Sequence, residues 1–435
     1  MSKKLILALT VLSFAFLGTT FAAVDSIKVS GSINEEAVTR DFALGGEALQ
    51  DDADKFLFSQ ITLRFDADLT EGVSAVIELI NERIWDQDVL GLSQGNYQFE
   101  INQAYVTLQE FLYQPLTLTI GRQNLAYGNR MIIGDSATAS GSVPGIITDL
   151  TLTVAFDAVR AVLDYAPYTV DVVYAKVDEN FVALADDVTL FGTNVSYDWS
   201  SYNGVTEGYF WSTDKAPGTL PGVTDRKSKV YTIGGRAQWD ANDKWTFGIE
   251  SAYQFGDLRN SATSHQHLSA YSNQFITQYR FLNRYNAKVG FNFTYLSGDD
   301  GKTASGSNAW NAMFEDQLQN AGEIIHALYT NTNAQIYTLT GSYMPREDIT
   351  LGMLFTYLRL NEDAAAFTGI NNGFAYAVDA GNTDLGQEID IYAIYDYTED
   401  VQLKLSSAFY MPGNFFDQAN DETAYSVRGG IRVTF

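Results

Sequence analysis

The sequence of 435 residues contains no cysteine, so neither disulfides nor thiolate-bound metals can hold the chain together. It has only 7 prolines, and its 35 glycines are spread without a linker-like break that would separate domains. It also lacks any uninterrupted run of 18 apolar residues, which excludes transmembrane helices. A chain of this length without linkers is expected to form one large, repetitive domain.

Basic residues are scarce: the chain has 27 lysines and arginines and 53 aspartates and glutamates. The resulting net charge of -26 disfavours nucleic acid as a partner. No nucleotide motif and no haem attachment motif is present, so we expect no cofactor and no energy input.

Histidine is scarcer still, with only His265, His267 and His326 in the chain. A hydrolase would need a histidine positioned beside a serine or aspartate, and all three fall in predicted loops or strand ends. We therefore expect no enzyme activity. His265 and His267 are two residues apart, which places them on one face of a strand. With no cysteine and no third obvious ligand, the sequence predicts no metal site there.

The N-terminus has the pattern of a secretory signal peptide. Lys3 and Lys4 precede an apolar run over residues 5–17, and small residues follow near Ala22. We expect a signal peptide over residues 1–22 and a mature domain over residues 23–435. Removing the two lysines makes the mature chain -28.

The C-terminal segment is an amphipathic strand. Between Tyr425 and Phe435, every second residue is apolar or glycine, and the residues between them are Ser, Arg, Gly, Arg and Thr. A strand that ends the chain leaves no following element to cover its apolar face, and lipid is the expected cover. We interpret Tyr425 and Phe435 as part of the strand that signals insertion by the barrel-assembly machinery.

Segments of this kind recur about every 20 residues, and the gaps between them alternate short and long. The clearest short turns are residues 70–72, 240–244, 345–348 and 398–400. The predicted strands are 27–41, 55–69, 73–84, 97–108, 116–122, 157–165, 169–177, 187–197, 205–213, 229–239, 245–255, 267–280, 286–297, 334–344, 350–360, 387–397, 401–411 and 424–435.

These eighteen strands predict an all-β fold, a transmembrane antiparallel β-barrel with short periplasmic turns and long extracellular loops. Sixteen strands remain an alternative, because the first strand and the stretch 187–213 have the weakest patterns. A soluble propeller is disfavoured because no repeating blade signature is present. The aromatic fraction of 14% fits girdles at two membrane interfaces. We therefore expect a bacterial outer-membrane location, with outer-membrane lipid and lipopolysaccharide as neighbours.

Alternation also predicts which charged residues line the lumen: Arg64, Glu78, Glu82, Arg236, Glu250, Lys288, Glu388, Asp390, Arg428 and Arg432. Both signs of charge are present. A mixed lining produces a transverse field that suits polar or small charged solutes.

Several short motifs resemble those of the alginate-export family of outer-membrane porins. They are Gly121-Arg122-Gln123, Tyr127-Gly128 with Arg130 and Gly134, Gln103-Ala-Tyr105-Val106, Phe156-Asp-Ala-Val159-Arg160 and Gly386-Gln-Glu-Ile389-Asp390. The resemblance implies a monomeric eighteen-stranded barrel narrowed by loops, although general porins are often trimers. It places Arg122, Arg130 and Tyr127 at the constriction, with Arg160 on the adjacent wall.

The alternative role for these arginines is to pair with lumen carboxylates and stiffen the wall. Asn129 departs from the family pattern, in which an acidic residue is expected, and this would weaken one ion pair at the constriction.

Two other loop features bear on function. The stretch from Trp310 to Leu318 predicts either an inward-folded plug or sugar-stacking platform, or an ordered lid. The segments 298–301 and 51–54 are acidic and could each contribute oxygen ligands to a loop-bound Ca²⁺, although neither has EF-hand spacing.

From these patterns we expect a porin that passes polar or charged small solutes or sugars passively through a loop-narrowed lumen. An exporter of an anionic, alginate-like polysaccharide is one alternative, and it would require a predominantly basic path. A structural barrel plugged by its loops is another. Sequence alternation fixes neither the solute nor the direction of transport.

Overall fold

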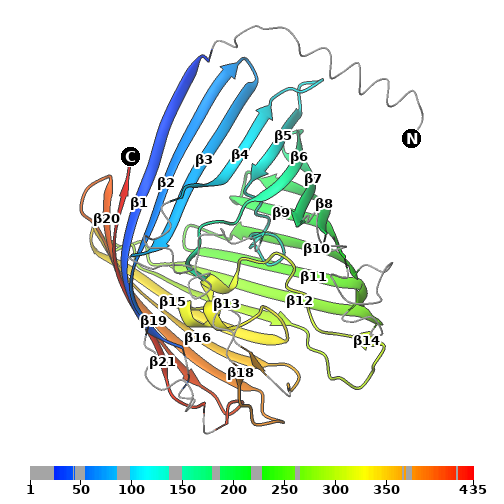
Figure 1. The fold of residues 1–435 in the computed structure, drawn as a ribbon, viewed down its shortest axis with the longest axis vertical. Helices are drawn as coiled ribbons and strands as arrows, with labels where there is room; N and C mark the ends of the chain where they lie inside the picture. The colour runs from blue at the N-terminus through cyan, green and yellow to red at the C-terminus, as the bar shows by residue number, and fades with distance from the viewer. Residues whose placement is uncertain are drawn as a thin grey trace.

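The computed structural model describes residues 24–42, 44, 54–85, 98–136, 149–178, 187–216, 228–259, 265–364, 367–368, 375–417 and 420–435. The expected signal peptide lies outside these residues. Within them, the chain forms one antiparallel β-barrel (Figure 1).

Eighteen strands make the barrel wall, which confirms the predicted number. They are β1 (Ser26–Asp41), β2 (Asp54–Thr70), β3 (Val73–Ile84), β4 (Glu100–Leu108), β5 (Leu116–Gln123), β6 (Phe156–Asp164), β7 (Tyr168–Asp178), β8 (Val188–Trp199), β9 (Gly204–Lys215), β10 (Ser228–Asp240), β11 (Trp245–Arg259), β12 (His265–Arg280), β13 (Lys288–Leu296), β15 (Ala334–Arg346), β16 (Ile349–Leu360), β19 (Asp384–Asp396), β20 (Val401–Pro412) and β21 (Ala424–Thr434). The first strand and the stretch 187–213, where the patterns were weakest, are both part of the wall.

The barrel closes between its first and last strands. β1 pairs antiparallel with β2 on one side and with β21 on the other. At the chain end, the backbone N–H of Phe435 donates to the carbonyl of Gly31 at 3.1 Å, and the N–H of Gly31 donates back to Phe435 at 2.9 Å. The C-terminal strand therefore closes the barrel, and the strands of the described wall have no free edge.

The connections between strands differ at the two ends of the barrel. The turns predicted at residues 70–72, 240–244, 345–348 and 398–400 join β2 to β3, β10 to β11, β15 to β16 and β19 to β20. At the opposite end lie the longer connections, among them those after β5 and after β13. We call these the turn end and the loop end, and the sequence pattern predicts that they face the periplasm and the cell exterior.

The wall has an apolar outer face and a polar inner face. On β11, Ile249 and Tyr253 are 49% and 44% exposed, whereas Glu250 and Gln254, which directly follow them, are 2% and 0% exposed. Because successive side chains of a strand point to opposite faces, the exposed apolar set is the outer face. Such a surface needs a lipid cover.

Aromatic side chains gather on this outer face near both ends of the strands. Near the turn end, Trp239 and Trp245 each pack against Phe247, at 5.9 and 5.7 Å between ring centroids. Near the loop end, Tyr231 stacks on Phe255 at 5.3 Å. These rows have the positions expected of membrane-interface girdles.

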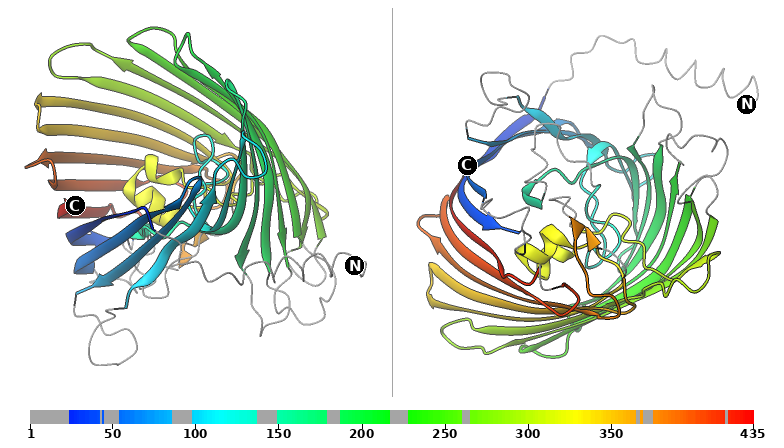
Figure 2. Two further views of the ribbon diagram at one scale, coloured as in Figure 1. Left: turned by 90° about the horizontal axis from the view of Figure 1, so that it is seen from above. Right: turned by 60° about the horizontal axis from the view of Figure 1, so that its bottom comes forward.

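The long connections place further elements inside the barrel or at its loop end: β14 (Gly306–Ser307), a 3₁₀ turn η3 (Leu318–Asn320), helix α2 (Glu323–Leu328), β17 (Phe367–Thr368) and β18 (Ala375–Tyr376). Viewed along the barrel, α2 lies within the ring of strands (Figure 2). Among the described helices, none has the length and apolar character to cross a bilayer.

Candidate functional site

Two long loops fold into the lumen and bind each other there. The β5–β6 loop comprises residues 124–155, and the β13–β15 loop comprises residues 297–333. The N–H of Phe314 donates to the carbonyl of Ile132 at 3.1 Å, and the N–H of Gly134 donates to Phe314 at 2.7 Å. The N–H of Asp316 donates to Arg130 at 3.0 Å. The loops therefore form a small sheet-like junction across the barrel interior.

A hydrophobic core forms around this junction, inside the barrel. Phe314 contacts Phe156 of the wall edge-on, with 5.6 Å between ring centroids. Trp310, Leu125 and Ile133 are 2%, 1% and 0% exposed. The stretch from Trp310 onward is thus an inward-folded segment, which is the first of its two predicted forms, and it obstructs part of the lumen.

The wall holds the β5–β6 loop through Asn129. Its side-chain oxygen accepts a hydrogen bond from Nε of Arg236 at 2.9 Å, and its amide nitrogen donates to Gln274 at 2.7 Å. Its backbone N–H donates to the carboxylate of Glu250 at 3.3 Å. The predicted lining residues Arg236 and Glu250 therefore hold the loop in addition to lining the wall. Asn129, where the family pattern has an acidic residue, is thus the loop residue that contacts Arg236 and Glu250.

Arg130 lies at the junction of the two loops. It adopts a left-handed backbone conformation with φ of 59°, and its guanidinium forms an ion pair with Asp316 at 2.5 Å. The Arg130 side chain is still 48% exposed, so one part of it faces the open lumen. Arg130 therefore joins the two loops and keeps part of its side chain exposed, and its role at the constriction stays a prediction.

Tyr127 and Arg160 lie together beside this junction. The guanidinium carbon of Arg160 is 5.8 Å from the centre of the Tyr127 ring, and Nε of Arg160 donates to Asp171 at 2.8 Å. Tyr127 also packs on Trp211, with 4.7 Å between ring centroids. The structure thus brings Tyr127, Arg130 and Arg160 into one region, as the family resemblance implies.

Arg122 does not join them, and its expected place at the constriction is wrong. It is paired in register with Asp157, which is next to Phe156, and Phe156 is buried inside the lumen. Alternation therefore puts Arg122 and Asp157 on the outer face, where their charged groups are 3.6 Å apart. The family motif suggested the position, but the parity of the strand decides the direction of the side chain.

Helix α2 is held to the wall by two carboxylates of β19. The N–H groups of Ile324 and Ile325 donate to the carboxylate oxygens of Glu388 at 2.8 and 2.7 Å, and the N–H of Glu323 donates to Asp390 at 3.1 Å. The first N–H groups of a helix have no partner within the helix, so these acceptors satisfy them. Glu388 is 0% exposed.

A second acidic anchor holds the end of the β5–β6 loop. Glu82 of β3 accepts hydrogen bonds from Thr151 at 2.6 Å and from the N–H of Leu152 at 2.8 Å. Nearby, Arg40 forms a buried ion pair with Asp149 at 2.8 Å. The inward carboxylates at Glu82, Glu250 and Glu388 therefore all bind inward loops.

Open space remains along β1 and β19 to β21, on the turn side of α2. Two neighbouring cavities of about 430 and 500 Å³ share Asp149, Lys404 and Arg428 in their walls. Arg428 pairs with Glu36 at 2.5 Å and approaches Glu323 at 3.6 Å. A further cavity of about 760 Å³ lies on the loop side of Phe314. The lumen is thus narrowed in its middle and open on both sides.

The other predicted lining residues also lie on the inward face. Arg64 forms ion pairs with Asp66 at 2.9 Å and with Glu78 at 3.4 Å. Arg432 lines the 500 Å³ cavity, and Lys288 lies at the turn end, opposite Arg280 in the register of β12 and β13. Alternation along the strands therefore predicted correctly that these side chains point inward.

Sequence reasoning missed Glu36, Asp149 and Glu323 as lining residues. Glu36 follows another glutamate in β1, and period-two alternation along that strand could have found it. Asp149 and Glu323 come from loops, where no period predicts a direction. Their positions depend on contacts that are far apart in sequence.

The predicted cation-binding loops stay predictions. Asp300 forms an ion pair with Lys302 at 2.8 Å, which occupies one of its carboxylate oxygens. The other segment falls largely outside the described residues, at positions 51–53. A different group comes together at the loop end, where Asp257 lies beside His265 and His267.

These features define an outer-membrane-type β-barrel with a loop-narrowed, mixed-charge lumen. The alginate export family matches residues 34–429, so the chain belongs to this family, which confirms the resemblance. Among curated proteins, no sequence match was found.

Solved porin structures share the fold. OccAB2 from Acinetobacter baumannii has 14% sequence identity and a TM-score of 0.58, covering 96% of this chain and 99% of that one. OpdQ from Pseudomonas aeruginosa has 12% identity and a TM-score of 0.58, covering 95% and 99%. A BenF-like porin from Pseudomonas fluorescens Pf-5 has 9% identity and a TM-score of 0.57, covering 95% and 99%.

Proposed function

We propose that this protein is a porin of the bacterial outer membrane that passes polar or small charged solutes passively. The observation that carries the proposal is the inward pairing of the β5–β6 and β13–β15 loops, which narrows a lumen that keeps open cavities on both sides. The apolar outer face and its aromatic rows support the membrane location. Lipid and lipopolysaccharide are the expected neighbours, and a monomer is the expected form.

The charges along the lumen support a small polar or charged solute. In one of the turn-side cavities, the basic side chains of Lys404 and Arg428 line the same space as the acidic side chains of Glu323 and Asp390. Groups of both signs around one cavity offer partners to a dipolar solute and let ions of either sign pass.

Export of an anionic polysaccharide is the second candidate, and the family match favours it. A polyuronate would require a mostly basic path, because each uronate residue carries a negative charge. In the cavity walls, Glu36 and Asp149 instead offset the positive charges of Arg428 and Arg40, so the path is mixed and not mostly basic. We therefore rank this function below passage of small solutes. A structural barrel, closed by its loops, is the remaining alternative, and a conductance measurement separates it from both.

Two arginines of the same motif provide a matched test in planar bilayers. Arg130→Ala removes a half-exposed positive charge from the loop junction, whereas Arg122→Ala removes one from the outer face. We expect Arg130→Ala to raise single-channel conductance and to shift the reversal potential in a salt gradient toward cation preference. Arg122→Ala should leave both unchanged. Equal effects of the two variants, or no effect of Arg130→Ala, would contradict the assignment of the constriction.

A further inference from the structure

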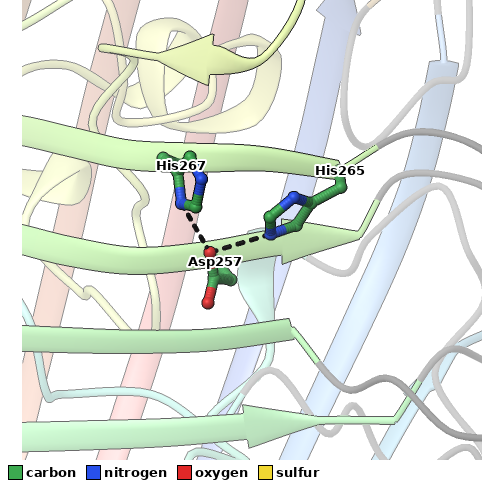
Figure 3. A group of neighbouring side chains, drawn as sticks. All are labelled: Asp257, His265 and His267. Carbon is green, nitrogen blue, oxygen red and sulfur yellow. Dashed lines mark hydrogen bonds and ion pairs between the residues drawn. The ribbon is translucent and has the colours of Figure 1, made fainter.

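A cluster of three metal-ligating side chains lies at the loop end of the barrel, away from the lumen. His265 and His267 come from the start of β12, and Asp257 comes from the end of β11. Nε2 of His265 is 2.9 Å from Oδ1 of Asp257, and Nδ1 of His267 is 2.8 Å from the same oxygen. Figure 3 shows both imidazole rings turned toward this carboxylate.

The register of the two strands brings these residues together. Asp257 and His267 are directly paired across the β11–β12 ladder, and His265 is two residues from His267 on the same face. Directly paired side chains have Cβ atoms about 5 Å apart, and diagonal neighbours remain within reach of long side chains. The backbone N–H of His267 also donates to Ser305 at 2.9 Å, which fixes the strand on its other side.

The cluster faces outward rather than into the lumen. Leu258 and Leu268, the chain neighbours of Asp257 and His267, pack into the hydrophobic core inside the barrel. Phe255, two residues before Asp257, belongs to the aromatic row on the outer face. The three side chains therefore lie on the outer surface, on the loop side of that row, where water and metal ions reach them. The His267 side chain is 71% exposed.

We propose that Asp257, His265 and His267 form a binding site for a borderline divalent transition metal ion, with Zn²⁺ as the reference ion. Zinc binds histidine nitrogen and carboxylate oxygen at about 2.0–2.2 Å, so ligand atoms in a tetrahedral site are roughly 3.3 Å apart. The three ligand atoms here all lie within 4.8 Å of one another. Small side-chain rotations suffice to admit an ion between them.

The ligand types define the class of metal. Two imidazoles and one carboxylate suit zinc, copper or nickel, whereas Ca²⁺ and Mg²⁺ prefer sites made only of oxygen atoms. Three protein ligands leave at least one coordination position for water or another small ligand.

A neighbouring lysine does not displace the metal from Asp257. Lys229 is paired with Asp257 in the register of β10 and β11, but its ammonium nitrogen is 3.4 Å from a carboxylate oxygen of Asp214. Among the described residues, Asp257, His265 and His267 are the group of three histidine, aspartate or glutamate side chains that lie close enough together to hold a metal ion.

The test is isothermal titration of ZnCl₂ into the full mature chain, refolded in detergent without a polyhistidine tag and freed of metal by a chelator. We expect one saturable site. Loss of an outer-shell partner typically costs 10–100-fold in metal affinity, so loss of a ligand in His267→Asn should cost more than about tenfold. His326→Asn, which removes the histidine outside the cluster, is the matched control and should bind zinc as the native chain does.

Two further measurements test the class of metal and the identity of its ligands. Excess Ca²⁺ should not displace Zn²⁺ from the cluster, because imidazole is a poor ligand for Ca²⁺. Absorption spectra with Co²⁺ should show a visible band in the native chain that Asp257→Asn and His267→Asn weaken. Native-like zinc affinity in a His265→Asn/His267→Asn double variant, or no saturable binding by the native chain, would overturn the proposal. A heat-modifiability gel, on which the unheated folded barrel migrates differently from the heated unfolded chain, would show whether a variant has misfolded.

Discussion

The docking of α2 on Glu388 makes the position of the inward β13–β15 loop sensitive to one side chain. Glu388→Ala removes both acceptors for the N–H groups of Ile324 and Ile325, which are buried. Leaving a buried backbone donor without an acceptor costs about 1–3 kcal/mol, so the loss of both acceptors costs roughly 2–6 kcal/mol. Since about 1.4 kcal/mol is a factor of ten, the ratio of docked to undocked helix should fall roughly 10- to 10⁴-fold.

Glu388→Gln should have an intermediate effect. Its carbonyl oxygen keeps one acceptor, while its amide group faces the second backbone N–H and cannot accept from it. A graded order of native, Gln and Ala is therefore expected, and this order distinguishes lost hydrogen bonds from general damage to the wall.

Hydrogen exchange of the peptide that contains residues 322–329 measures this docking directly. We expect exchange to accelerate in the order native, Gln, Ala, with a parallel rise in single-channel conductance. Glu78→Ala is the matched control for hydrogen exchange, because within the described residues the hydrogen bonds of Glu78 go to wall residues such as Arg64 and Asn102. Exchange and conductance of Glu388→Ala equal to those of the native chain would refute the proposed anchoring of α2.

Three further predictions concern other parts of the barrel. Burial raises the pKa of Glu315 in the β13–β15 loop to about 7 from 4.5, so protonation of Glu315 stabilises the docked loop below pH 4.5, and this contribution is lost as pH rises through 7. Hydrogen exchange of the loop, corrected for intrinsic rates, should therefore be faster at pH 8 than at pH 5, and Glu315→Gln should remove the difference. Asn129→Asp adds a negative charge 2.9 Å from Nε of Arg236 and should shift the reversal potential toward cations; a shift toward anions would contradict the lumen assignment. Phe435→Ala should lower the heat-modifiable, assembled fraction in outer membranes if the terminal aromatic acts as an insertion signal, and an unchanged fraction would contradict that role.

The wall of the barrel could be predicted from the sequence because its signals are local. Alternation in a segment such as 245–255 reports which face meets lipid, and turn residues such as Gly72, with φ of 71°, mark where strands end. Lumen-facing charges follow from the same alternation, which is why Glu250 and Arg428 were assigned to the correct face.

Loop structure could not be predicted in this way, because it depends on contacts between distant residues. Phe314 meets Ile132 across 182 positions of sequence, and neither segment has a period that indicates a partner. The third metal ligand, Asp257, was missed because finding it requires the register between two strands in addition to the spacing of the histidines within one. Arg122 was misplaced because a motif gives a position in the chain, whereas parity within the strand gives the direction.

The most direct test of the central claim is the single-channel conductance and reversal potential of the refolded mature chain in a planar bilayer under a salt gradient. The mixed lining and the carboxylates around Arg428 predict discrete steps with weak cation preference. Steps with strong anion preference would contradict passage of small solutes of either sign and favour export of an anionic polysaccharide. The absence of steps would show that the paired loops close the barrel.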